Sequence, residues 1–90
     1  MIEEDIENYL CESVKAAGGD TRKVEWVGRK HAPDRRVMHP KRCAWVECKA
    51  PKKGPRPGQL REHERMRAVG EDVVVVSTYE EVDAFMETLK

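Results

Sequence analysis

Length, composition and charge describe a small, highly charged chain. It has 90 residues, of which 38% are charged, and its 17 Lys and Arg residues balance its 17 Asp and Glu residues. We expect a single domain over 1–90, which buries a smaller share of its surface than a larger protein does. No apolar run approaches the roughly 20 residues of a membrane span, and we expect no signal peptide. Three cysteines without a Cys-x-x-Cys pair support neither a disulfide framework nor a zinc ribbon, and fit a reducing cytoplasm.

The net charge of zero conceals an uneven distribution along the chain. Residues 1–20 hold six acids against one base, and so do residues 71–90, whereas residues 21–70 hold fifteen bases against five acids. A basic central segment suits binding to a phosphate backbone. A second interpretation is that acidic and basic segments pair within the fold or across a dimer.

The first predicted elements are a helix over 2–17 and a strand over 21–27. In the helix, apolar residues recur at three- and four-residue spacing, acids crowd the first turn, and two glycines end it. In the strand, Val24 and Trp26 share a face. A basic loop over 28–31 follows, in which Arg29 and Lys30 are candidates for contact with nucleic acid.

A β-hairpin is predicted over 32–49, with a turn at residues 40–42. Alternate side chains of a strand share a face, so Glu47 and Lys49 project to the same side. Folding the hairpin brings Asp34, at the start of its first strand, close to Glu47. Two carboxylates suit a hard ion such as Mg²⁺, which can polarise a phosphoryl oxygen and activate a bound water. Lys49 could orient that water or stabilise charge on phosphorus, so the pattern predicts metal-dependent phosphodiester hydrolysis.

Each motif also has an ordinary interpretation. Glu-x-Lys on a strand is usually an exposed ion pair, and Pro-Asp is a common turn dipeptide. Their order and spacing, with apolar residues between them, favour a site. Zinc held by His31, His39, Cys43 and Cys48 fits no standard ligand spacing, and Cys48, opposite Glu47, is predicted to lie in the core.

The remaining elements are a basic loop, a helix, a strand and a last helix. The loop over 50–58 is rich in proline and carries three candidate phosphate contacts: Lys52, Lys53 and Arg56. The helix over 57–69 is expected to turn Leu60, Met66 and Val69 inward. The four valines of 73–76 predict a strand buried on both faces, in the middle of a mixed sheet. Thr78 and Glu81 form a capping box for the last helix. The sum is an α/β fold of order αβββαβα, with helices on both faces of a mixed sheet.

Pro33-Asp34 followed by Glu47-Cys48-Lys49 matches the PD-(D/E)xK nuclease signature. With Gln59 opening a helix and Gly70 before the valine run, the chain resembles the virus-type replication-repair nuclease (VRR-Nuc) branch, in its stand-alone phage or bacterial form. The resemblance covers nearly the whole chain. His31 stands where members of that branch often carry glycine.

The resemblance implies a restriction-endonuclease-like core and a set of site residues. Asp34, Glu47, the Cys48 backbone carbonyl and a glutamate on the first helix are expected to hold Mg²⁺ or Mn²⁺, with Lys49 beside the attacking water and Gln59 in the active site. Glu7 is the expected helix glutamate, because its distance to the glycine ending the helix resembles that in archaeal Holliday-junction resolvases. Glu3, one turn earlier, is the alternative.

The expected function is cleavage of DNA phosphodiesters in the cytoplasm of a bacterial or phage-infected cell. A chain this small has no room for a sequence-reading module, so we expect recognition of DNA shape, such as a four-way junction bound by a homodimer. Arg35 joins the candidate DNA contacts. The alternatives are a monomeric flap- or single-strand-directed nuclease, a non-catalytic nucleic-acid-binding or assembly module with a nuclease fold, and a basic junction-binding scaffold.

Overall fold

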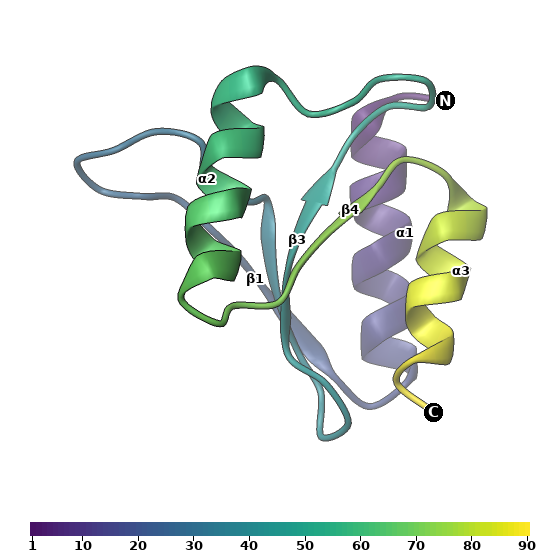
Figure 1. Ribbon diagram of the computed structural model, residues 1–90. Coiled ribbons are helices and arrows are strands. Elements are labelled where there is room, and N and C mark those ends of the chain that lie inside the picture. The colour runs from purple at the N-terminus through teal and green to yellow at the C-terminus, as the bar shows by residue number, and fades with distance from the viewer.

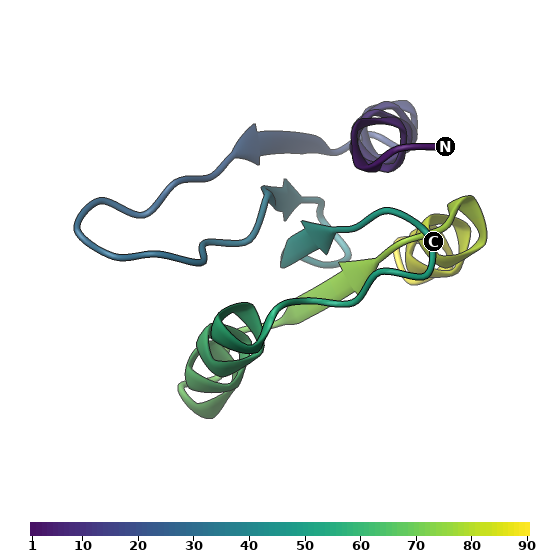
Figure 2. The same ribbon diagram turned by 90° about the horizontal axis from the view of Figure 1, so that it is seen from above.

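A computed structural model describes residues 1–90 as a four-stranded mixed sheet with helices on both faces (Figures 1 and 2). The elements are α1 (Glu3–Ala16), β1 (Asp20–Lys23), β2 (Arg35–Met38), β3 (Ala44–Cys48), α2 (Pro57–Ala68), β4 (Val73–Val76) and α3 (Tyr79–Glu87). The predicted order αβββαβα is therefore confirmed. None of the helices combines the length and apolar character needed to span a membrane.

The strands lie in the order β1-β2-β3-β4. The β1–β2 and β2–β3 pairs are antiparallel, with Arg35 opposite Val46, so residues 35–48 form the expected hairpin. The β3–β4 pair is parallel, with Glu47 opposite Val75. A parallel neighbour needs a crossover connection, which α2 supplies. This topology leaves the end of β3 and the residues just before β2 at the same end of the sheet.

Helices α1 and α3 lie side by side on one face of the sheet, where the main core forms (Figure 2). The apolar stripe of α1 supplies Ile6, Leu10 and Val14, all completely buried. Alternation along β3 turns Ala44, Val46 and Cys48 into this core, so Trp45 and Glu47 face the other side. Of the predicted capping box one half is present, because Thr78 caps α3 by accepting the N–H of Glu81. The side chain of Glu81 accepts the N–H of Ser77 rather than that of Thr78.

Helix α2 lies alone on the opposite face and packs near β4 (Figure 1). The prediction for its inner face was only partly right. Met66 is buried, but Leu60 is 46% exposed and Val69 is 79% exposed. The polar residues Glu62 and His63 are buried in their place. A helix that covers a polar part of a sheet buries the side chains that face it, polar ones included, and apolar periodicity alone does not reveal this.

Two strand predictions also need correction. Strand β1 ends at Lys23 rather than Val27, because Trp26 leaves the sheet to donate its indole N–H to Glu62 of α2 at 2.8 Å. Strand β4 lies at the edge of the sheet rather than in its middle, and Val74 and Val75 are only half-buried. A run of valines fits an edge strand whose faces are covered by α2 and α3.

Candidate active site

The hairpin places Asp34 beside the end of β3. Asp34 directly precedes β2, and its Oδ2 accepts the backbone N–H of Cys48 at 2.7 Å. This hydrogen bond links the two strands at the point where the hairpin opens. It orients the carboxylate of Asp34 toward Glu47 and Cys48, the last two residues of β3.

Glu47 is buried and surrounded by hydrogen-bond donors. Its Oε2 lies 3.7 Å from Nζ of Lys49 and 3.4 Å from Nε2 of Gln59, while its Oε1 lies 3.5 Å from Nε2 of His63. Burial, together with the neighbouring carboxylate of Asp34, raises the pKa of Glu47 to about 8. A nearby cation would relieve the cost of ionising this group.

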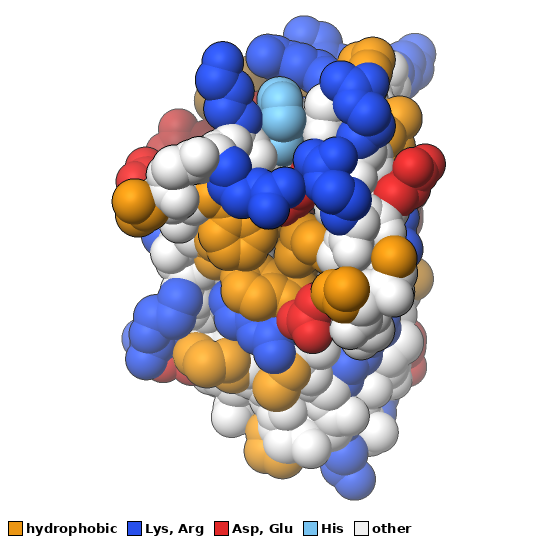
Figure 3. Space-filling view, turned by 60° about the vertical axis from the view of Figure 1, so that its left-hand side comes forward, with side chains coloured by type: hydrophobic (Ala, Val, Ile, Leu, Met, Phe, Trp, Pro, Cys, Tyr) orange, Lys and Arg blue, Asp and Glu red, His pale blue; other side chains and the backbone are white.

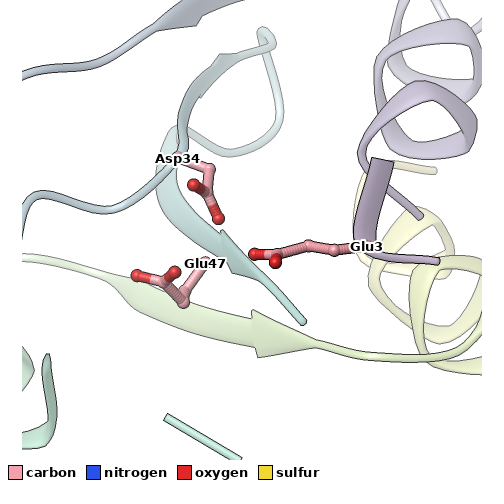
Figure 4. A group of neighbouring side chains, drawn as sticks. All are labelled: Glu3, Asp34 and Glu47. Atoms are coloured by element: carbon pink, nitrogen blue, oxygen red, sulfur yellow. The ribbon is translucent and has the colours of Figure 1, made fainter. Parts of the chain in front are cut away.

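A third carboxylate reaches the pair from the first turn of α1. One oxygen each from Glu3, Asp34 and Glu47 lies within 4.8 Å of the others, and Figure 4 shows Glu3 extending from the helix toward the two sheet residues. These are hard oxygen ligands, which suit Mg²⁺ or Mn²⁺. Two oxygens bound to one Mg²⁺ are at most about 4 Å apart, given bond lengths of about 2.1 Å. The group therefore fits one ion after a small contraction, or with waters completing its shell.

Glu7, the expected helix ligand, lies outside this group. Its Oε2 accepts hydrogen bonds from Lys23 at 2.9 Å and from Arg35 at 2.7 Å. Burial raises the pKa of Glu7, but the two cationic donors outweigh it and leave the pKa below its usual value. The same pairing occupies Arg35, which was expected to contact DNA. One turn of α1 separates Glu3 from Glu7, and Glu7 faces Lys23 of β1 and Arg35 of β2, so Glu3 is the helix glutamate that reaches Asp34 and Glu47 in this structure.

The other predicted basic contacts lie on the surface. Lys30, Lys52, Lys53 and Arg56 are exposed, and Arg29 is exposed while pairing with Glu62 of α2. Figure 3 shows the face formed by α2 and the loop between β1 and β2, where Lys and Arg side chains gather above a hydrophobic area. His31 packs against Gly58 at the start of α2, in space that a Cβ at that position would fill. The loop over 24–34 and the start of α2 therefore form one basic surface.

The residues considered for zinc lie in different surroundings. His31 contacts Gly58, whereas His39 hydrogen-bonds the carbonyl of Ala17 at 2.9 Å. Cys43 is exposed near the hairpin turn. Cys48 is buried in the core, as expected, and burial raises the pKa of its thiol.

Sequence reasoning missed the two buried polar residues of α2. Glu62 holds the loop by accepting from Trp26 and Arg29, and His63 lies against Glu47. One signal was available for His63. It follows Gln59 by four residues, so both share a helix face, and that face meets the site.

The fold and this site define a class of protein. An antiparallel hairpin carrying Pro-Asp and Glu-x-Lys, followed by a crossover helix and a parallel strand, is the arrangement of the PD-(D/E)xK nucleases. No family model matches the chain. It is 44% identical over 80 residues to "Putative nuclease p44" of Acyrthosiphon pisum secondary endosymbiont phage 1, covering 87% of this chain and 86% of that protein. A solved structure described as a VRR_NUC domain superposes with a TM-score of 0.86 at 39% identity, over 94% of each chain. The chain belongs to the VRR-Nuc family.

Proposed function

We propose that this chain is a Mg²⁺- or Mn²⁺-dependent nuclease that hydrolyses DNA phosphodiester bonds. The observation that carries the proposal is the convergence of Glu3, Asp34 and Glu47 beside the ammonium of Lys49. Family membership and the nuclease name of the phage relative support the same activity.

Each side chain has a role in this proposal. Glu3, Asp34 and Glu47, with the Cys48 backbone carbonyl, hold the ion. When bound, the ion supplies Lewis-acid polarisation of a phosphoryl oxygen and a water of lowered pKa. Lys49, only 12% exposed, places a positive charge where negative charge develops on phosphorus and can orient the attacking water. Gln59 donates to Glu47 and so helps to hold it.

The substrate we propose is branched DNA, with the four-way junction as the preferred form. Support comes from the exposed Lys and Arg side chains of the loop over 24–34 and of residues 52–56, which are suited to contact DNA phosphates. Phosphate contacts carry no sequence information by themselves. Contacts of this kind respond to the shape of the DNA rather than to its sequence, and so support a preference for branched forms.

We also propose a homodimer, because paired incisions across a junction need two active sites. Two large apolar side chains, Leu60 in the first turn of α2 and Val69 just after its last residue, are exposed and available to a partner subunit. Sedimentation should give twice the monomer mass, and Val69→Lys should shift the protein toward monomer. If the wild-type protein is a monomer and cuts flaps or single strands, the result would favour the alternative function, a monomeric flap- or single-strand-directed nuclease.

The test is an incision assay on linear, flapped and four-way DNAs in Mg²⁺, in Mn²⁺ and in chelator. Wild type should cut the four-way junction only with metal. Lys49→Ala should lower the rate by about 100-fold or more, the loss typical of removing one group that stabilises developing charge. Lys41→Ala, in the β2–β3 turn at the far end of β3, is the matched control and should cut at the wild-type rate.

Two outcomes would overturn the proposal. Wild-type protein that binds the junction but produces no cut in Mn²⁺ would favour a non-catalytic module or scaffold. A Lys49→Ala variant as fast as wild type would show that the site lies elsewhere.

A further inference from the structure

His63 is a buried polar residue that has no role in the proposed mechanism. Its side chain is completely buried in α2, and neither ring nitrogen has a hydrogen-bond partner. The only other buried side-chain oxygen or nitrogen without a partner is Oε1 of Glu47. A buried polar group without a partner is destabilising, so its presence calls for an explanation.

The two unpartnered groups face each other. Nε2 of His63 lies 3.5 Å from Oε1 of Glu47, a few tenths of an ångström beyond the usual range of about 2.7–3.2 Å for such a hydrogen bond. A neutral imidazole carries one N–H, and Nε2 is the nitrogen that has an acceptor nearby.

Gln59 completes the arrangement from one turn earlier on the same helix. Its Nε2 lies 3.4 Å from Oε2 of Glu47, the other oxygen of the carboxylate. Helix α2 thus presents one donor to each oxygen of Glu47. Two donors on one rigid helix restrict rotation of the carboxylate, whereas Gln59 alone would leave Oε1 free to turn.

We propose that His63 is a positioning residue: its Nε2–H donates to Oε1 of Glu47 and holds that carboxylate in the orientation that binds the divalent ion. This inference rests on the proposed metal-dependent activity. Helix α2 then has two roles. Glu62 holds the loop over 24–34, which we propose contacts DNA, and the adjacent His63 orients Glu47. Partners that orient a metal ligand typically contribute about 10- to 100-fold in metal affinity.

The test separates positioning from packing by comparing His63→Leu with His63→Gln. Leucine fills a similar volume without polar atoms, so the free energy of unfolding in urea should stay level or rise. The Mn²⁺ dissociation constant from calorimetry should nevertheless increase at least about tenfold. Glutamine restores an N–H donor and should return the affinity to within about threefold of wild type. Met66→Leu, also buried on α2 but without polar contacts at the site, is the control and should bind Mn²⁺ like wild type.

Several results would overturn the inference. One is wild-type Mn²⁺ affinity in a folded His63→Leu variant, which would show that the ring only packs. Another is a His63→Gln variant as weak as His63→Leu. If His63→Leu does not fold, ¹⁵N NMR of the wild-type ring in Mg²⁺ decides, since the proton must reside on Nε2, and an Nδ1–H ring contradicts the proposal. Failure of the proposed function is distinguishable, because wild-type protein would then neither bind Mn²⁺ nor cut DNA.

Discussion

At the scale of single residues, the first turns of α1 show how closely position determines role. Glu3, Glu4, Asp5 and Glu7 all lie near the start of the helix, yet only Glu3 joins Asp34 and Glu47. Asp5 accepts the N–H of Ile2, and Glu7 pairs with Lys23 and Arg35. The family resemblance predicted a glutamate from this segment in the site and favoured Glu7, with Glu3, one turn earlier, as the alternative. That choice depends on which sheet residue each carboxylate meets.

We predict that Glu3→Gln weakens Mn²⁺ binding at least tenfold, about 1.4 kcal/mol, because it removes one of three anionic ligands. Glu4→Gln, the exposed neighbour, should bind like wild type. Glu7→Gln should lower the free energy of unfolding through loss of its two cationic partners and leave Mn²⁺ affinity nearly unchanged. Calorimetry and urea unfolding measure both quantities. Equal loss of affinity in Glu3→Gln and Glu4→Gln would remove Glu3 from the site.

The raised pKa of Glu47 predicts a pH-dependent stability in the absence of metal. Its usual pKa is 4.5 and its pKa in the folded protein is about 8, so the folded state holds the proton more tightly than the unfolded state. The contribution of Glu47 to the free energy of unfolding should therefore be lost as pH rises from about 4.5 to about 8. Urea unfolding in chelator at pH 5, 6.5 and 8 tests this.

Glu47→Gln is the reference for that measurement because it cannot ionise. Its stability relative to wild type should increase steadily with pH over this range. A difference between the two proteins that is the same at all three pH values would contradict the raised pKa.

At the scale of elements, the loop over 24–34 is held in place by a single buried carboxylate. Glu62 is 3% exposed and accepts from Trp26 at 2.8 Å, Arg29 at 2.9 Å and Arg65 at 3.1 Å. The edge-to-face contact between Trp26 and Trp45 joins the same loop to β3. Alternation of apolar residues through Trp26 predicted a longer first strand. The partner that draws Trp26 out of the sheet lies 36 residues further along the chain, beyond the reach of local patterns.

Glu62→Gln should loosen this loop while leaving the metal ligands in place. We expect the free energy of unfolding to fall by about 1.5–3 kcal/mol, the range for hydrogen bonds to a charged group. The KM for junction DNA should rise several-fold with kcat nearly constant, and amide exchange over 25–31 should accelerate. Glu64→Gln, exposed on the same helix, is the control. A drop in kcat at unchanged KM would contradict a role confined to the loop.

At the scale of the whole molecule, the separation of charge along the sequence becomes a separation in space. The acidic first and last segments form α1 and α3 on one face, while the basic middle supplies the loop and α2 on the other (Figure 1). The hairpin, the crossover and the order of elements followed from local patterns and turn residues. The shared face of Glu47 and Lys49 followed from strand alternation, and the closeness of Asp34 to Glu47 followed from the hairpin. The burial of Glu62 and His63 and the edge position of β4 did not, because they depend on contacts between elements.

The basic face predicts salt-dependent DNA binding with a defined slope. Each phosphate contact on duplex DNA contributes about −0.9 to the slope of log K against log salt concentration. Replacing both Lys52 and Lys53 by alanine should therefore reduce the magnitude of the slope by about 2. Arg22→Ala, exposed on β1 and paired with Asp20, should leave the slope unchanged. Equal slopes for the double variant and wild type would place the DNA elsewhere.

The central claim is that a divalent-metal site lies among Glu3, Asp34 and Glu47. The most direct test is a crystal grown with Mn²⁺ and measured for anomalous scattering. The account predicts a single strong peak, or two adjacent peaks, within bonding distance of carboxylates from this group and absent in an Asp34→Asn crystal. Clear density for the three side chains with no anomalous peak between them would contradict it.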